Sequence, residues 1–123
     1  MVNKQDYINS ITQDITIVRG DTLAFSFILG GLGSQAEYES LNFAFSVVEH
    51  YDETPIITVG NDDIILEEYN AEKDEALFTV CLSPQLTKDL ELGRYYYDLQ
   101  FSTSANVITL MRGHFTLVYD VSK

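Results

Sequence analysis

The sequence predicts an all-β fold, an antiparallel β-sandwich of seven to eight strands with one short helical turn near residues 84–90. Three observations carry this prediction. Apolar and polar residues alternate with a period of two along most of the chain, which is typical of strands with one buried face. Turn residues interrupt the alternation about every 8–12 residues, and no long stretch has the helical periodicity needed to cover a parallel sheet.

In the first half of the chain, the clearest alternation runs from Leu23 to Leu29, where four large apolar residues share one face. A glycine-rich break at residues 30–33 ends this strand, and an acidic loop is expected through Glu37 and Glu39. Other alternating or apolar segments predict further strands over residues 15–18, 41–47, 56–59 and 64–66.

In the second half, residues 75–82 read as the next strand, and the segment after it is the one helical stretch. Ser83 suits an N-cap and Pro84 suits the first helical position, where its missing N–H costs nothing. Gly93 ends the stretch, so only one or two turns fit. The remaining strands are predicted over residues 94–101, 107–112 and 114–121.

The domain organisation is simple. The 123 residues suit one domain, which we expect over residues 15–123, preceded by a polar N-terminal extension over residues 1–14. The single cysteine excludes an internal disulfide, so the core must hold together by packing alone. The N-terminus lacks the pattern of a secretory signal, and no apolar run approaches the ~20 residues of a membrane span.

A short motif recurs near the two ends of the predicted domain. Residues 15–20 read ITIVRG and residues 108–113 read ITLMRG. Chance similarity between two strands is one interpretation. The other is that both segments use glycine at a bulge or kink, as neighbouring first and last strands of the sandwich.

Charge excludes some partners. The chain has 7 Lys and Arg against 19 Asp and Glu, a formal net charge of -12. This balance argues against nucleic acid and against anionic membranes, and it favours basic or divalent-cation partners. Nine of the acids lie within residues 52–75, which we interpret as a solvated acidic surface. Asn61, Asp62 and Asp63 are the weak candidates for a cation site, but their spacing matches no EF-hand loop, and we expect no metal.

No catalytic motif is present. His50, His114 and Cys81 are the only imidazole and thiol groups, and no nucleophile elbow, zinc-protease, phosphate-loop or dinucleotide pattern occurs. We therefore expect no enzyme activity and no cofactor, with a calcium-dependent or hydrolytic domain as the weakest hypothesis. Cys81 is interpreted as a small buried hydrophobe in mid-strand.

Two further motifs favour structural interpretations. Residues 19–21 spell Arg-Gly-Asp, the integrin-recognition tripeptide, but they fall between two strands and predict a short turn or bulge. Tyr95 and Tyr97 share the face of Leu99 and Phe101 and should pack in the core, while Tyr96 points the other way.

Residues 92–95, Leu-Gly-Arg-Tyr, follow the helical turn and begin a strand. This arrangement resembles the tyrosine corner of immunoglobulin-like sandwiches, in which the tyrosine hydroxyl bonds to the backbone a few residues upstream. The resemblance implies an immunoglobulin-like order of strands. The disulfide and core tryptophan of antibody domains are absent from the sequence, so an antibody-type member is excluded.

Three segments resemble the N-terminal domain of upper baseplate proteins from phages and prophages of Gram-positive bacteria. They are IVRGDTLAF at residues 17–25, LELGRYYYDL at residues 90–99, and TLMRGHFTL at residues 109–117, which is followed by Tyr119-Asp120-Val121. The likeness spans residues 15–121. These are patterns of strands and turns, so the family supplies no catalytic residues to transfer.

The resemblance implies a non-catalytic structural or assembly module of a phage tail, located in the virion and assembled in the host cytoplasm. Its partners would be tail or baseplate proteins, with self-association into a homo-oligomer as a further option, and neither nucleic acid nor membrane. The alternative is a cell-surface or adhesion-type immunoglobulin-like module that binds protein or glycan.

Overall fold

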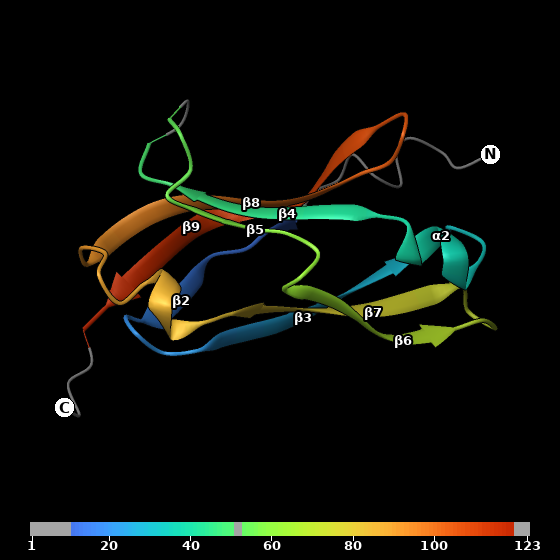
Figure 1. Cartoon of the computed structure of the whole chain (residues 1–123), viewed down its shortest axis with the longest axis horizontal. Helices are drawn as coiled ribbons and strands as arrows, with labels where there is room; N and C mark the ends of the chain where they lie inside the picture. The colour runs from blue at the N-terminus through green and yellow to red at the C-terminus, as the bar shows by residue number, and fades with distance from the viewer. Residues whose placement is uncertain (1–10, 51–52, 120–123) are drawn as a thin grey trace.

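The computed structural model describes residues 11–50 and 53–119, which fold into two β-sheets packed face to face (Figure 1). The all-β sandwich predicted from the alternation is confirmed. The described residues form nine strands, one of which has only two residues, against the seven to eight expected. Among the described residues, no helix is both long and apolar enough to cross a membrane.

The larger sheet has six strands, in the order β1–β9–β8–β4–β5, with β2 also paired to β9. The strands β5, β4, β8 and β9 pair antiparallel with one another, whereas β1 and β2 run parallel to β9. Their bounds are Ile11–Thr12 for β1, Ile15–Val18 for β2, Asn42–Val48 for β4, Ile57–Val59 for β5, Gly93–Ser102 for β8 and Val107–Val118 for β9.

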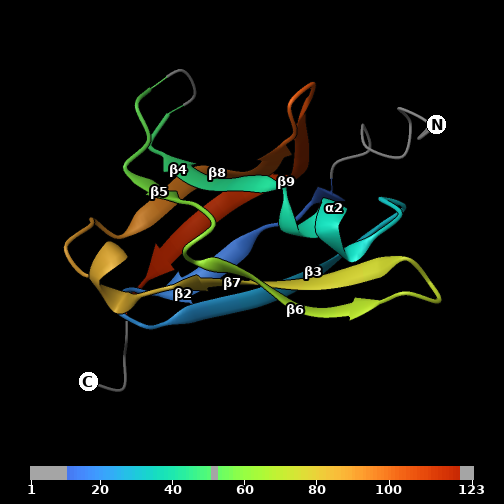
Figure 2. The same cartoon turned by 45° about the vertical axis from the view of Figure 1, so that its right-hand side comes forward.

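The smaller sheet has three antiparallel strands, with β7 between β3 and β6 (Figure 2). These strands are β3 (Leu23–Gly30), β6 (Ile64–Asn70) and β7 (Glu75–Leu82). Together, the two sheets reproduce the immunoglobulin pattern. In the larger sheet β4, β8 and β9 take the places of the immunoglobulin strands C, F and G, and in the smaller sheet β3, β6 and β7 take those of B, D and E. The expected immunoglobulin-like order is therefore observed.

Two short helical elements lie outside the sheets. The 3-10 helix η1 (Pro84–Leu86) confirms the predicted helical turn, although the Ser83 side chain makes no capping hydrogen bond. The helix α2 (Gln35–Glu39) replaces the expected acidic loop. The Ser34 hydroxyl caps the helix by accepting a hydrogen bond from the amide of Glu37, and the helical residue Tyr38 is buried. A five-residue helix is too short to show a helical period, which is why the sequence did not predict it.

The core lies between the sheets and is rich in aromatic side chains. Phe45, on β4, is completely buried and stacks on Tyr97 with ring centroids 5.4 Å apart. Tyr95 and Tyr97 are buried and Tyr96 faces outward, as predicted. The Tyr95 hydroxyl donates a 2.7 Å hydrogen bond to the carbonyl of Glu91, which confirms the tyrosine corner.

The N-terminal strands form one interrupted parallel strand along β9. Ile11 faces Met111 and Ile15 faces Phe115, so the pairing keeps the same register on both sides of the interruption. At the interruption, the amide of Gln13 bonds to the carbonyl of Arg112, and the carboxylate of Asp14 accepts a hydrogen bond from the amide of His114. This hydrogen bond is the main cause that lowers the pKa of Asp14. Residues 11–14, assigned above to an extension, thus belong to the sheet, and residues 1–10 lie outside the described residues.

Gly113 makes this close approach sterically feasible. A Cβ atom at this position would overlap the carbonyl oxygen of Gln13 and lie 2.9 Å from its carbonyl carbon. The repeated motif at residues 15–20 and 108–113 therefore belongs to neighbouring first and last strands. Its two glycines differ in role, because Gly20 adopts a positive φ of 87° in a turn.

We expect Gly113→Ala to lower the free energy of unfolding by about 2–3 kcal/mol, because the added methyl group meets backbone that cannot move without breaking strand pairs. Urea denaturation measures the change. Gly60→Ala is the matched control, since its Cβ would lie 3.5 Å from the nearest backbone oxygen, an ordinary contact. Equal stability of the two variants would contradict the steric argument.

Candidate interaction surface

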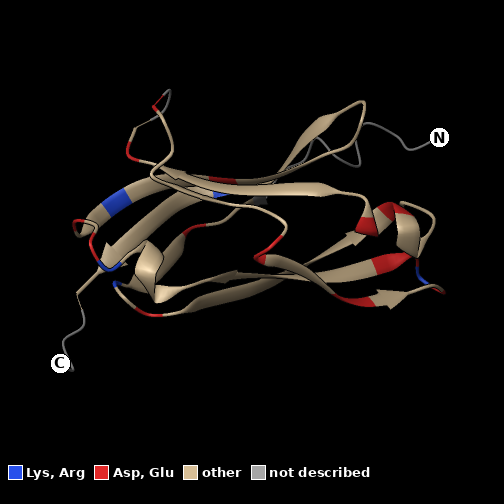
Figure 3. Ribbon diagram, in the orientation of Figure 1, with Lys and Arg blue, Asp and Glu red and all other residues tan. Residues whose placement is uncertain are grey.

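Seven acidic residues gather at one end of the sandwich. In Figure 3 they lie over α2 and the adjoining parts of β6 and β7, whereas most of the cations lie toward the other end. Of the cations in the described part of the chain, Lys73 alone belongs to the acidic end. The acids of this end are Glu37, Glu39, Glu67, Glu68, Glu72, Asp74 and Glu75.

The outer face of the smaller sheet is apolar at its centre. Alternation directs Phe78 and Val80 of β7 into the core, so Leu77 and Thr79 point outward. Across the neighbouring strands, the same face carries Ile28, which is 62% exposed, and Ile65, which is 50% exposed. The outer face of the smaller sheet is defined by Ala24, Ser26, Ile28, Ile65, Glu68, Asn70, Glu75, Leu77, Thr79 and Cys81.

Cys81 is part of this exposed face, so its prediction as a buried residue is wrong. The alternation placed it correctly on the side away from Phe78 and Val80. That side was assumed to be covered, but no element of the described chain covers the smaller sheet from outside (Figure 1).

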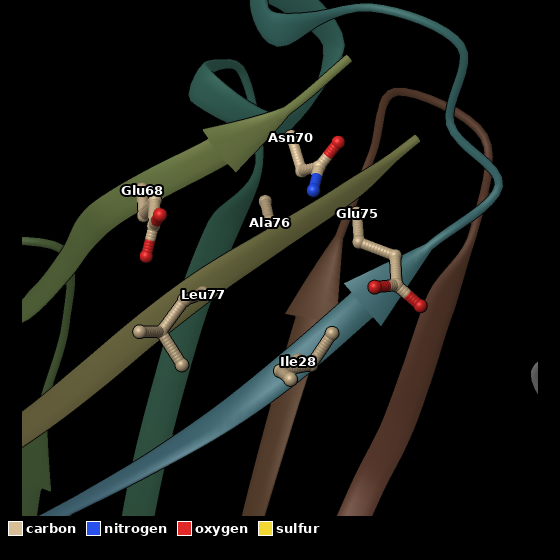
Figure 4. A pocket seen from close by; sticks show the side chains of 6 residues that line it. All are labelled: Ile28, Glu68, Asn70, Glu75, Ala76 and Leu77. Atoms are coloured by element: carbon tan, nitrogen blue, oxygen red, sulfur yellow. The ribbon is translucent and has the colours of Figure 1, made fainter. Parts of the chain in front are cut away.

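A shallow hollow of about 160 Å³ lies where the apolar centre meets the acidic end (Figure 4). Ile28 and Leu77 provide apolar surface, while the carboxylates of Glu68 and Glu75 flank it together with the amide of Asn70. Neither carboxylate has an ion pair with a residue that the structure describes. Such a site suits a long basic side chain, whose methylene groups cover apolar surface while its charge meets the carboxylates.

The Arg-Gly-Asp tripeptide forms a short turn, as predicted, and the turn is tied to the segment after η1. The Arg19 guanidinium donates to the carbonyl of Leu90, and the amide of Gly20 donates to the buried hydroxyl of Thr87, both at 3.0 Å. The amide of Asp21 closes the turn on the carbonyl of Val18. The tripeptide therefore serves as a structural connection between distant segments.

Of the candidates for a cation site, Asn61 uses its side chain to hold the backbone in place. The side chain of Asn61 accepts a hydrogen bond from the amide of Phe43 at 2.8 Å and donates one to the carbonyl of Leu41 at 2.9 Å. It therefore anchors the turn to β4, while Asp62 and Asp63 are exposed. Within the described ranges, one cluster of three side chains has ligand atoms close enough together to hold a metal ion. It consists of Glu49, His50 and Glu53, and all three residues are exposed.

The histidines and the cysteine are not brought together. His50 lies beyond the end of β4, with Nε2 4.0 Å from a Glu53 carboxylate oxygen. His114 lies on β9, with Nδ1 3.5 Å from the carboxylate of Asp14. Cys81 is on β7 in the other sheet. This arrangement offers no pairing of a thiol with an imidazole base.

The larger sheet carries a groove of about 300 Å³ on its outer face, lined in part by Ser46, Tyr96, Asp98 and Arg112. Within the described part of the chain, the Oδ1 atom of Asp98 is buried and accepts no hydrogen bond. This burial raises the pKa of Asp98. The sequence placed Asp98 on the outward side of its strand, but alternation cannot reveal how deeply neighbouring side chains enclose a carboxylate.

Comparison with known proteins identifies no family. No family model matches the chain, and no curated protein matches it. The resemblance to phage baseplate proteins therefore rests on the sequence motifs alone.

We expect Asp98→Asn to raise the free energy of unfolding at pH 7 by about 1 kcal/mol, because an ionised buried oxygen without a partner is costly. Since the folded-state pKa is raised, the folded protein retains this proton at pH values where the unfolded chain has lost it. Ionisation therefore lowers stability as the pH rises from about 4 through the raised pKa.

Urea denaturation between pH 4 and pH 8 tests this expectation. The gain from Asp98→Asn should shrink toward zero at the acidic end of the range. Asp89→Asn is the control, because Asp89 is exposed and the substitution removes the same charge. A gain of equal size in the control, or one that does not vary with pH, would show that burial of Asp98 is not its cause.

Proposed function

We propose that this protein is a non-catalytic structural module of a phage or prophage tail, of the baseplate type, that assembles with other virion proteins. The observation that carries the proposal is the outer face of the smaller sheet, where Ile28, Ile65 and Leu77 lie beside carboxylates that have no ion pair with a described residue. Large apolar residues gathered on an exposed sheet face mark a surface that another protein covers. The baseplate-like motifs supply the biological setting.

The charge distribution specifies the partner. An apolar centre flanked by Glu68 and Glu75 favours a protein surface with apolar residues in the middle and lysine or arginine at its border. The rest of the acidic end extends the negative potential beyond the contact. Such complementarity raises the rate of association and disfavours acidic competitors.

The alternative is an adhesion-type module for protein or glycan, and the groove on the larger sheet favours it. There, the Asp98 carboxylate has an acceptor atom without a partner in the described chain, close to the ring of Tyr96 and the guanidinium of Arg112. A carboxylate, an aromatic ring and a guanidinium suit the hydroxyls and ring faces of a sugar.

The test measures binding of the purified chain to each protein encoded by its neighbouring genes. We expect one of these proteins to bind, and Glu68→Lys with Glu75→Lys to weaken the complex by roughly tenfold or more, because both substitutions reverse complementary charges. Biolayer interferometry at two salt concentrations gives the affinity and its electrostatic part.

Asp89→Lys with Glu91→Lys is the matched control, since both residues are exposed and lie outside the outer face of the smaller sheet. This pair should change the affinity by less than about threefold. If neither pair alters binding but Asp98→Ala abolishes it, the groove is the functional surface. Failure of every neighbouring protein to bind would remove the assembly proposal.

A further inference from the structure

The four outer strand edges of the two sheets differ in their protection. In the larger sheet, one edge is β5, with three residues, and the other is the pair β1 and β2, interrupted at residues 13–14. In the smaller sheet, the β6 edge carries Glu67 and Glu68 and a bulge beside Leu66. Short length, charges and bulges all discourage pairing with another chain.

The remaining edge, β3, has none of these features. Its eight residues, LAFSFILG, include no charge and no proline, and they pair with β7 in unbroken register from Leu23 to Gly30. No other strand lies beside β3 in the described part of the chain. Long, regular and uncharged edges are ready templates for a further strand.

Backbone geometry shows which groups of β3 are available. The amide of Cys81 donates a hydrogen bond to the carbonyl of Asp63, on the β6 side of β7. The residues of β7 that alternate with Cys81 therefore direct their backbone groups to the other side, toward β3. Among them, Phe78 pairs with Phe27 and Val80 pairs with Phe25. By the same alternation, the backbone N–H and C=O groups of Ala24, Ser26 and Ile28 point away from β7, toward the open edge.

The side chains of β3 are also incompletely covered. Those that face the core are only partly buried, although they pack against it; they are Leu23, Phe25, Phe27 and Leu29. The outward-facing side chains of Ala24, Ser26 and Ile28 are exposed. A strand added to this edge would cover apolar surface on both sides of the sheet while pairing the free backbone groups.

We propose that β3 pairs antiparallel with β3 of a second copy of this chain, with Ser26 next to its counterpart on a two-fold axis. Ala24 then faces Ile28 of the other copy, and the two smaller sheets become one continuous six-stranded sheet. This self-pairing uses the backbone groups directed at the edge, and it closes at two copies because each copy has one such strand.

The placement of charge favours a second copy as the occupant. Acidic chains repel one another, but the acids of the smaller sheet lie on the far strand β6 and at the first residue of β7, Glu75. In the paired sheet, the two β6 strands are about 24 Å apart, five strand spacings, which exceeds the Debye length of about 8 Å. The contact strand itself carries no charge, so it offers a strongly basic partner no electrostatic advantage. This inference does not depend on the proposed tail function.

Sedimentation analysis of the purified chain tests the inference. Because one strand pair buries less than a standard interface, we expect a monomer–dimer equilibrium between roughly 10 μM and 1 mM. Ser26→Lys should reduce the association constant by roughly tenfold or more, since lysine protects edges. Thr58→Lys is the matched control on the β5 edge, where Thr58 is exposed, and it should leave the constant unchanged.

A second measurement fixes the register. In a Cys81→Ser background, Ser26→Cys should form a covalent dimer on mild oxidation with copper phenanthroline in air, because the two thiols meet at the axis. Ser46→Cys, on the larger sheet, should not form one. A chain that stays monomeric at 1 mM, a Ser26→Cys variant that crosslinks no faster than Ser46→Cys, or polymers in place of dimers would each overturn the proposal.

Discussion

The close approach of Gln13 to Gly113 allows the first strands of the chain to lie along β9 in the larger sheet. With no side chain at Gly113, the N-terminal segment can follow β9 in one register on both sides of residues 13–14. The smaller sheet keeps three strands, and β3, which follows directly, has no neighbour on one side within the described part of the chain. The open edge of β3 therefore follows from the placement of the first strands on β9.

A side chain of β8 holds this close approach from inside the core. The hydroxyl of Tyr97 donates a hydrogen bond to the carbonyl of Gln13, and burial raises the pKa of this tyrosine to about 12. The hydroxyl therefore remains a donor at any physiological pH. Two residues earlier, Tyr95 satisfies the carbonyl of Glu91 in the same way. One strand thus anchors both the start of the sandwich and the loop before β8, through tyrosines whose rings are part of the core.

The local sequence pattern predicted the features that depend on neighbouring residues along the chain. Alternation identified the strands and the inward direction of Tyr95 and Tyr97, and the Leu-Gly-Arg-Tyr sequence identified the corner, because backbone geometry and burial repeat with the residue period. The exposure of Cys81 could not be predicted in this way, because it depends on whether another layer covers the smaller sheet. The same holds for Asp98, whose burial depends on neighbours from three strands. The role of Gly113 could not be predicted either, because it appears only when Gln13 lies against this residue in the folded structure.

The proposed surfaces of the smaller sheet are geometrically compatible. A docking partner covers the outer face, to which the side chains of Ile28, Ile65 and Leu77 project, whereas a second copy extends the sheet sideways through the backbone of β3. Pairing therefore places two outer faces next to each other on one continuous sheet, with their acidic ends apart. A partner with two binding sites could then engage both copies, and the second contact would form at the high effective concentration set by the first. A weak strand pair and a modest apolar face would in this way stabilise an assembly that neither could hold alone.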